Sequence, residues 1–424
     1  MNKASARNTL ETYPPASIDT PLANTAQCDA SSTSSNSQYG KGGHSGRGGR
    51  GQVRRGGRGG CFPQPVILSV PALASNTSCN FPAIFNFGDS NTDTGADSAA
   101  FSLVTPPYGE YFFHMPAGRP SDGRLTIDFM AERFRLPNLS AYLDSLGTNF
   151  SHGANFAVSG ATIRPSDRSR IGRGPSPFYL DVQVSHTGGI YTNLLPKEEF
   201  FGQALYTFDI GQNDIGLGLF SNQSLAKIKA DIPDVISKLS MNIQAVYGLG
   251  GRSFWIHNTG PIGCFAYILT NFPVCNASDI DKAGCATPYN EVSQYFNQKL
   301  KEAVVKIRKQ LPLAAITYVD IYSVKYLLMS QPQDFGFQQP LVACCGFGGK
   351  YNFSNTARCG QTVVVDGKRT FIGSCANPSV RVNWDGSHLT EAANKFIVDK
   401  IVTGKFSDPP ISLQNACNRD ASSA

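Results

Sequence analysis

Apolar residues along this chain form short strand-length runs that alternate with longer stretches of helical periodicity. The strand-length runs, rich in aromatic and β-branched residues, cover 82–88, 204–210, 252–258 and 314–320, with a shorter one near 154–158. Helical spacing marks residues 125–135, 225–247, 289–310 and 389–402. Strands that alternate with helices predict an α/β fold, in which a parallel sheet has helices on both faces.

The first strand-length run ends at Gly88-Asp89-Ser90. Residues 91–93 are of the kind that begins a helix, so the pattern places a hydroxyl at a strand-to-helix corner. Backbone N–H groups and the helix dipole favour negative charge at such a corner. Ser90 is therefore the candidate nucleophile. Ser159 lies in another turn and is a weaker candidate, because it lacks the strand-then-helix setting.

A serine hydroxyl needs a base to take its proton, and the base needs an acid to hold it in the correct tautomer. His388 lies just before the last predicted helix, three residues after Asp385. A tight loop would let this carboxylate bond one ring nitrogen while the other nitrogen faces Ser90. Taken alone, the two residues are better explained as a loop that caps the helix.

Acyl transfer also needs hydrogen-bond donors where the oxyanion develops. The Gly160 N–H, the Asn213 side-chain amide and the Ser90 N–H are the candidates, although each glycine or asparagine also suits an ordinary turn. No Gly-x-Ser-x-Gly elbow occurs in the chain, which argues against an α/β-hydrolase.

The charge of the chain is uneven. The 424 residues carry a net charge of +6, but residues 1–60 hold eight Lys/Arg against three Asp/Glu. The rest holds 29 against 28, so the body is nearly neutral. Its charge favours neither a nucleic-acid partner nor an anionic membrane surface. A hydrophobic content of 41% is enough for a large globular core.

The N-terminal part differs in composition from the rest. Residues 1–60 are poor in apolar residues and Gly/Arg-rich from Lys41 onward, so we expect disorder. This stretch is either an RNA-binding tail or, as we favour, an extension without a role. Residues 62–75 resemble the end of a signal peptide, although they lie sixty residues into the chain, and they are too short to span a membrane. The expected division is 1–60, a signal-like segment at 61–78, a catalytic domain at 79–410 and a tail at 411–424.

Eleven cysteines favour an oxidising compartment, and six Asn-x-Ser/Thr sequons agree with secretion. There is no Cys-x-x-Cys pair, so we expect neither a zinc site nor a redox motif. The adjacent Cys344 and Cys345 should bond to two different partners. Nine cysteines lie from Cys79 onward, so at least one is free or bonds Cys28 or Cys61.

Over residues 80–410 the chain resembles the GDSL (SGNH-hydrolase) family, and its secreted plant esterase/lipases in particular. The resemblance rests on four blocks in the family's order, namely Gly88-Asp89-Ser90 with Asp93-Thr94-Gly95, Gly160, Gly211-x-Asn213-Asp214, and Asp385-x-x-His388. One weak block would mean little, but four in order are specific. Asn91 replaces the leucine of the family's first motif, which does not alter the chemistry.

The resemblance implies a three-layer α/β/α flavodoxin-like sandwich with about five parallel strands. It also implies that Ser90 is the nucleophile, His388 the base and then the acid, and Asp385 the residue that orients His388. The oxyanion hole would consist of Ser90, Gly160 and Asn213. Such an enzyme hydrolyses small-molecule or lipid esters through an acyl-serine and needs no cofactor or metal. An acyltransferase, or a catalytically silent fold with an RNA-binding tail, remains an alternative.

Overall fold

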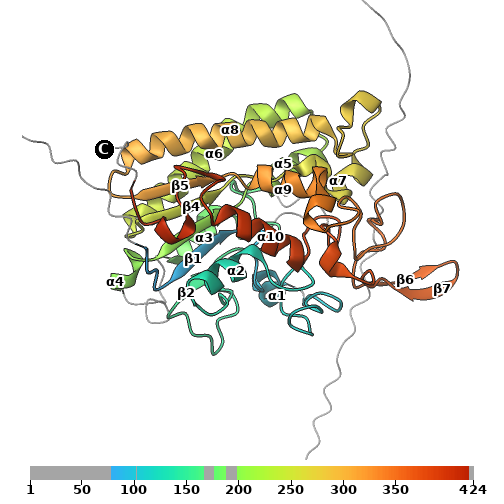
Figure 1. Ribbon diagram of the computed structural model, residues 1–424, viewed down its shortest axis with the longest axis horizontal. Coiled ribbons are helices and arrows are strands. Elements are labelled where there is room, and N and C mark those ends of the chain that lie inside the picture. The colour runs from blue at the N-terminus through green and yellow to red at the C-terminus, as the bar shows by residue number, and fades with distance from the viewer. Residues whose placement is uncertain (1–77, 102, 167–175, 188–197, 420–424) are drawn as a thin grey trace, which may run out of the picture. The chain divides into compact units, whose positions relative to one another are not determined.

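A six-stranded sheet is central to the protein, whose computed structural model describes residues 78–101, 103–166, 176–187 and 198–419. Its strands are β1 (Ile84–Gly88), β2 (Gly153–Asn155), β3 (Leu205–Asp209), β4 (Ser253–His257), β5 (Ala315–Val319) and β8 (Ser407–Asp408). They lie in the order β2-β1-β3-β4-β5-β8, and only β8 pairs antiparallel to its neighbour within this sheet. Strands β1, β2, β4 and β5 are labelled in Figure 1. The predicted α/β class is confirmed, and the order of the five parallel strands is that of flavodoxin-like folds.

Every residue of β1, β3, β4 and β5 is buried. Strands covered on both faces read as nearly continuous apolar runs, which explains why the sequence marked them clearly. The short β2 overlaps the run predicted near 154–158. The terminal β8 has only two residues and was not predicted, because so short a segment carries no period.

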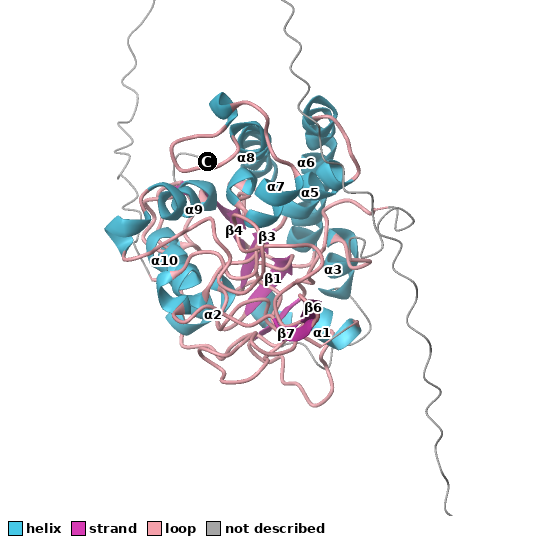
Figure 2. Ribbon diagram, turned by 90° about the vertical axis from the view of Figure 1, so that its right-hand side faces the viewer, coloured by secondary structure: helices cyan, strands magenta, loops and turns pink. Residues whose placement is uncertain are grey.

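Helices cover both faces of the sheet, in two groups (Figure 2). In one group α6 packs against α3 and α8, and in the other α10 packs against α2 and α9. The helices are α1 (Ala96–Ala100), α2 (Thr126–Arg133), α3 (Leu180–Thr187), α4 (Glu198–Phe201), α5 (Gln212–Phe220), α6 (Leu225–Gly248), α7 (Ala266–Asn271), α8 (Thr287–Gln310), α9 (Ile321–Ser330) and α10 (Glu391–Ile401).

The four predicted helices are confirmed as α2, α6, α8 and α10. In α6 the buried apolar residues recur at helical spacing, from Ile228 and Ile232 to Leu239, Ile243 and Val246. The unpredicted helices α3, α4, α5, α7 and α9 have at most ten residues each. Helices this short give few repeats by which an apolar face can stand out, and α2, with eight residues, is the one helix of this length that was predicted.

The segment between β1 and α1 differs from the predicted structure. A helix was predicted to begin near Asn91, but residues 89–95 form turns and α1 begins only at Ala96. Asp93 explains the delay, because its Oδ1 accepts hydrogen bonds from the N–H groups of Gly95 at 2.8 Å and Ala96 at 2.6 Å. The side chain of Asp93, three residues after Ser90, thereby stabilises the start of α1 at Ala96. Ser90 lies on a turn rather than at a helix N-terminus.

A separate hairpin was also not predicted. Strands β6 (Thr362–Val365) and β7 (Lys368–Phe371) pair antiparallel and extend away from the sheet in Figure 1. Asp366 and Gly367 form the turn between them with positive φ angles of 49° and 76°. Asp-Gly between two strand-forming runs is nevertheless a strong hairpin signal in a sequence.

The cysteines follow the expected pattern. Cys344 bonds Cys375 and its neighbour Cys345 bonds Cys359, so the prediction of two different partners is confirmed. The remaining bridges join Cys264 to Cys285 and Cys79 to Cys417. Cys275 is also disulfide-bonded, so every cysteine in the described part of the chain is oxidised.

The Cys79–Cys417 bridge ties the two ends of the described domain together. Leu413 and Ala416 are buried in the same apolar core as the sheet, so the folded part continues beyond residue 410. The expected extension 1–60 and nearly all of the signal-like segment lie outside the described residues. Within the described residues no helix has the length and apolarity needed to cross a bilayer.

Candidate active site

Ser90 lies just beyond the carboxyl end of β1, in a turn held from both sides. The Asp89 N–H donates to the Asp209 carbonyl at 3.3 Å, which joins this turn to the end of β3. The Asp89 carboxylate accepts from the N–H and the side-chain amide of Asn91 at 3.0 and 2.8 Å. Gly88 is required here, because a Cβ on it would lie 2.4 Å from the Asp209 carbonyl oxygen. The turn therefore presents Ser90 with 8% of its surface exposed.

The Gly160 turn is bonded directly to the Ser90 turn. The Val158 N–H donates to the Gly88 carbonyl at 3.2 Å. Asp93 Oδ2 accepts from the N–H of Ser159 at 2.7 Å and from its hydroxyl at 2.8 Å. Gly160 itself has a φ of 76°, in the left-handed region that favours glycine. The Ser159 hydroxyl is thus committed to a carboxylate that also stabilises the start of α1, which weakens it further as a nucleophile.

Asn213 lies in the first turn of α5, after the carboxyl end of β3. Its side-chain amide donates to the Ala161 carbonyl at 2.9 Å, so the Asn213 turn is joined to the Gly160 turn. Asp214 strengthens the same junction, because its carboxylate accepts the N–H groups of Ile163 at 2.9 Å and Arg164 at 3.3 Å. The three turns that carry Ser90, Gly160 and Asn213 therefore form one hydrogen-bonded edge.

Asp385 and His388 lie in the loop before α10 and are in direct contact. His388 Nδ1 lies 2.7 Å from Asp385 Oδ2, and the His388 backbone N–H donates to Asp385 Oδ1 at 2.9 Å. Burial alone would raise the pKa of Asp385, but the charge and the hydrogen bond of His388 outweigh it and hold that pKa well below its usual value. Burial alone would lower the pKa of His388, but the Asp385 carboxylate outweighs burial, so the pKa of His388 is raised.

Two carboxylates of the Ser90 turn act electrostatically on His388. After Asp385, the carboxylates that raise the pKa of His388 are Asp89 and Asp93, which flank Ser90. His388 in turn acts on the carboxylate of Asp97 at the start of α1. The described side-chain hydrogen bonds of His388 use only Nδ1, and none joins it to Ser90 in the described part of the chain. Nε2 is therefore the ring nitrogen left for proton transfer.

A second acid–histidine pair lies deeper in the protein. His257 Nδ1 lies 3.0 Å from Asp209 Oδ2, and the two side chains are 2% and 6% exposed. His257 Nε2 is buried without a hydrogen-bond partner among the described residues. Such a site cannot admit an ester, so His388, with a side chain 19% exposed, is the better candidate base.

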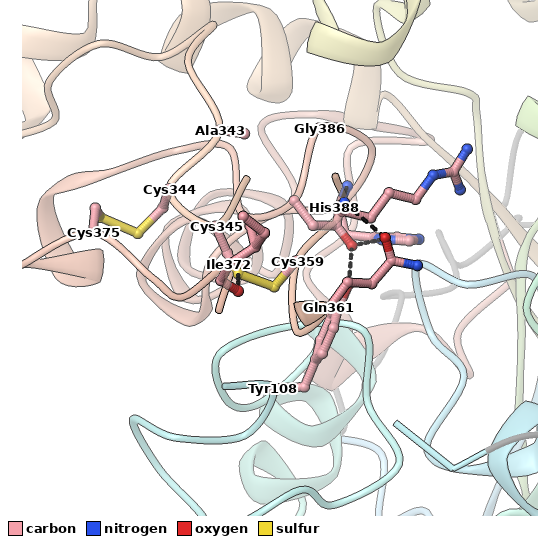
Figure 3. The surroundings of a disulfide bond; sticks show 12 residues. Tyr108, Ala343, Cys344, Cys345, Cys359, Gln361, Ile372, Cys375, Gly386 and His388 are labelled. Atoms are coloured by element: carbon pink, nitrogen blue, oxygen red, sulfur yellow. Dashed lines mark hydrogen bonds and ion pairs between the residues drawn. A yellow bond between two sulfur atoms is a disulfide. The ribbon is translucent and has the colours of Figure 1, made fainter. Parts of the chain in front are cut away.

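Two residues of the site were missed in the sequence. Gln183 on α3 accepts from the Gly88 N–H at 3.0 Å and donates to the Gly88 carbonyl at 2.8 Å, which holds the last residue of β1 from the neighbouring helix. Tyr108 donates its hydroxyl to Asp385 Oδ2 at 2.9 Å (Figure 3). Neither has a sequence signal, because each acts across more than ninety residues. The described residues contain no cluster of three potential metal ligands.

A serine turn and two candidate oxyanion donors at one edge of the sheet, together with an Asp–His pair in the loop before α10, are the residue types that a serine hydrolase requires. The chain belongs to the GDSL-like lipase/acylhydrolase family, whose model matches residues 84–401. The chain is 57% identical to an esterase of Hevea brasiliensis, over 83% of this chain and 92% of that protein.

Two relatives from Arabidopsis thaliana are similarly close. A GDSL esterase/lipase, At3g26430, is 53% identical over 82% of this chain and 94% of its own length. A protein named alpha-L-fucosidase 3 is 51% identical over 84% of this chain and 99% of its own length. The chain is thus a carboxylic ester hydrolase of the plant GDSL esterase/lipase family.

Proposed function

We propose that the protein hydrolyses carboxylic esters through an acyl-Ser90 intermediate, with His388 as general base and then acid and Asp385 as the residue that orients it. The observation that carries this proposal is the 2.7 Å contact between His388 Nδ1 and Asp385 Oδ2. The carboxylates of Asp89 and Asp93, on either side of Ser90, also raise the pKa of this histidine. A histidine oriented in this way beside a serine turn is the arrangement that activates a hydroxyl.

The proton path follows from which ring nitrogen is occupied. Asp385 holds Nδ1, so Nε2 takes the proton from Ser90 as its oxygen attacks the ester carbonyl. The tetrahedral intermediate collapses to the acyl-serine when the alkoxide leaves and takes that proton from Nε2. Water then attacks the acyl group, gives a proton to Nε2, and the acid is released as Ser90 regains its proton.

The oxyanion would be stabilised by three donors. The Asn213 amide has two N–H bonds and uses one on the Ala161 carbonyl, so the other is available. The backbone N–H groups of Ser90 and Gly160 supply the other two, on turns fixed by Asp89 and Asp93. Donors fixed before the reaction stabilise the developing charge without reorganisation during the step.

An ester substrate fits the site better than a glycoside, despite the fucosidase name of one relative. Glycoside hydrolysis commonly uses two carboxyl groups that act on either side of the glycosidic bond. Asp385 is already bonded by His388, Tyr108 and Ser387, so it is not free to act on a sugar. The same acyl-Ser90 could pass its acyl group to an alcohol, which would make the enzyme a transferase. The oxidised cysteines support secretion.

Purified protein should hydrolyse p-nitrophenyl acetate or butyrate and become labelled on Ser90 by a fluorophosphonate. Ser90→Ala should abolish both, and Asn213→Ala should lower kcat about a hundredfold or more because one oxyanion donor is lost. Ser159→Ala is the matched control and should keep the label. Wild-type turnover in folded Ser90→Ala would refute the proposal. Products formed with an added alcohol would separate hydrolase from transferase.

A further inference from the structure

Tyr108 contacts the candidate triad from a distant part of the chain. Its hydroxyl donates to Asp385 Oδ2 at 2.9 Å, and this is the same oxygen that lies 2.7 Å from His388 Nδ1. Asp385 Oδ1 is bonded separately, by the N–H groups of Ser387 at 3.0 Å and His388 at 2.9 Å. Tyr108 and His388 therefore share one oxygen of the acid.

The Tyr108 ring packs against residues that disulfide bonds hold in place. The ring packs edge-on against Trp384, with centroids 5.9 Å apart, next to a cluster formed by Trp384 and the cysteines 344, 345 and 359. Figure 3 shows Tyr108 beside the Cys345–Cys359 disulfide and near His388. The Cys345 N–H donates to the Trp384 carbonyl, so the cysteines and the Asp385 loop are bonded together.

The backbone around Tyr108 is also bonded to the end of the same loop. The Gly109 N–H donates to the Ser121 carbonyl at 2.8 Å, and the Ser121 hydroxyl donates to the Leu389 carbonyl at 3.0 Å. Asp122 accepts the Glu391 N–H at 2.6 Å. The Tyr108 hydroxyl is thus set against Asp385 before any substrate arrives, which gives a preorganised contact rather than a mobile one.

We propose that Tyr108 is a positioning residue of the ester hydrolase, whose hydroxyl holds Asp385 Oδ2 and moderates how strongly that oxygen stabilises protonated His388. A donor on the carboxylate draws charge from the shared oxygen, so the imidazolium gains less from it. Without the hydroxyl, Asp385 stabilises the imidazolium more strongly. The inference rests on the proposed function, since it assigns Tyr108 a role through Asp385 and His388.

Tyr108→Phe keeps the ring against Trp384 and removes only the donor. Because activity needs neutral His388, the acid limb of kcat/KM should move to higher pH, by about half a unit to one unit. On the alkaline plateau, kcat should fall by roughly threefold to thirtyfold, since the acid is less firmly held. The matched control is Tyr326→Phe, which removes a similar hydroxyl bond, 2.8 Å to Asp281. It should leave the acid limb unchanged.

The possible outcomes separate this inference from the proposed function. If Tyr108→Phe is folded and its acid limb and kcat match those of wild type while His388→Ala is inactive, Tyr108 has no positioning role and the triad stands. A lower melting temperature with an unmoved acid limb would also overturn the inference, because it would show packing alone. If His388→Ala keeps wild-type activity, the proposed function itself fails.

Discussion

At the scale of single residues, the proposed role of His388 as the base implies that the charge around it sets the pH range in which the enzyme is active. Asp385 is the main cause that raises the pKa of this histidine, and Asp89 and Asp93 add to it. Protonated His388 cannot accept the Ser90 proton, so the acid limb of kcat/KM should lie above 6.5, the ordinary pKa of histidine.

Asp97 allows a test of this charge effect. Its carboxylate makes none of the described hydrogen bonds, so replacing it removes a charge and breaks no such bond. His388 and the Asp97 carboxylate act on each other electrostatically. Asp97→Asn removes one negative charge, which disfavours the imidazolium and should move the acid limb to lower pH by a few tenths of a unit. This shift is opposite to that expected for Tyr108→Phe. Asp366→Asn, at the tip of the β6–β7 hairpin, should produce none, and an equal shift there would refute a local charge effect.

At the scale of elements, a disulfide-bonded arm, residues 342–383, supports the loop that carries Asp385 and His388. The N–H groups of Cys344 and Cys345 donate to the carbonyls of Asn383 and Trp384 at 2.9 and 2.6 Å. Phe353 of the same arm packs so closely on Gly386 that a Cβ there would lie 2.2 Å from its ring. The loop geometry therefore depends on the arm.

Removing the Cys345–Cys359 bridge as a double serine variant should lower both stability and kcat. Its loop, with a sequence separation of 14, predicts a loss of about 3 kcal/mol in the free energy of unfolding. The control is the double serine variant at Cys79 and Cys417, whose separation is 338. That variant should lose more stability by calorimetry yet keep kcat well below its melting temperature. Equal kcat in both variants would show that the arm does not position His388.

At the scale of the whole molecule, several buried acids set the dependence of stability on pH. Burial raises the pKa of Asp89 to about 7 and the pKa values of Asp122 and Asp214 to about 6. An acid with a raised pKa binds its proton more tightly in the folded state. Its ionisation therefore costs stability as pH rises from about 4 through its folded pKa. His388, whose pKa is also raised, loses its contribution as pH rises through its folded pKa.

Two acids with lowered pKa values have the opposite effect on stability, and only at low pH. The pKa values of Asp385 and Asp408 are lowered, so their contribution is lost as pH falls below about 4. The melting temperature should therefore rise as the pH is lowered from 8 to about 5 and fall again below about 4. Asp122→Asn should flatten the slope between pH 4 and 6, measured by scanning calorimetry. A melting temperature that is highest at pH 8 would contradict this balance.

Local patterns in the sequence were sufficient for the five parallel strands and for the helices α2, α6, α8 and α10. The strand ending at Gly88 was predicted because burial on both faces gives a nearly continuous apolar run. The helix α10 was predicted because burial of one face imposes a helical period on its apolar residues. The hairpin at Asp366-Gly367 could have been found in the same way. The candidate residues Ser90, Gly160, Asn213, Asp385 and His388 were named from short blocks, and their catalytic roles remain predictions.

Contacts between distant segments were decided only by the tertiary structure. Asp93 delays α1 and binds Ser159, Gln183 holds Gly88, and Tyr108 reaches Asp385 across 277 residues. A side chain that acts across the fold leaves no period or spacing in its own segment, since its partner is chosen by strand order and loop packing. The sequence by itself determined the α/β class and the residue types of the site. The fold decided which carboxylates act on His388, and therefore the pH dependence expected of its proposed role as a base.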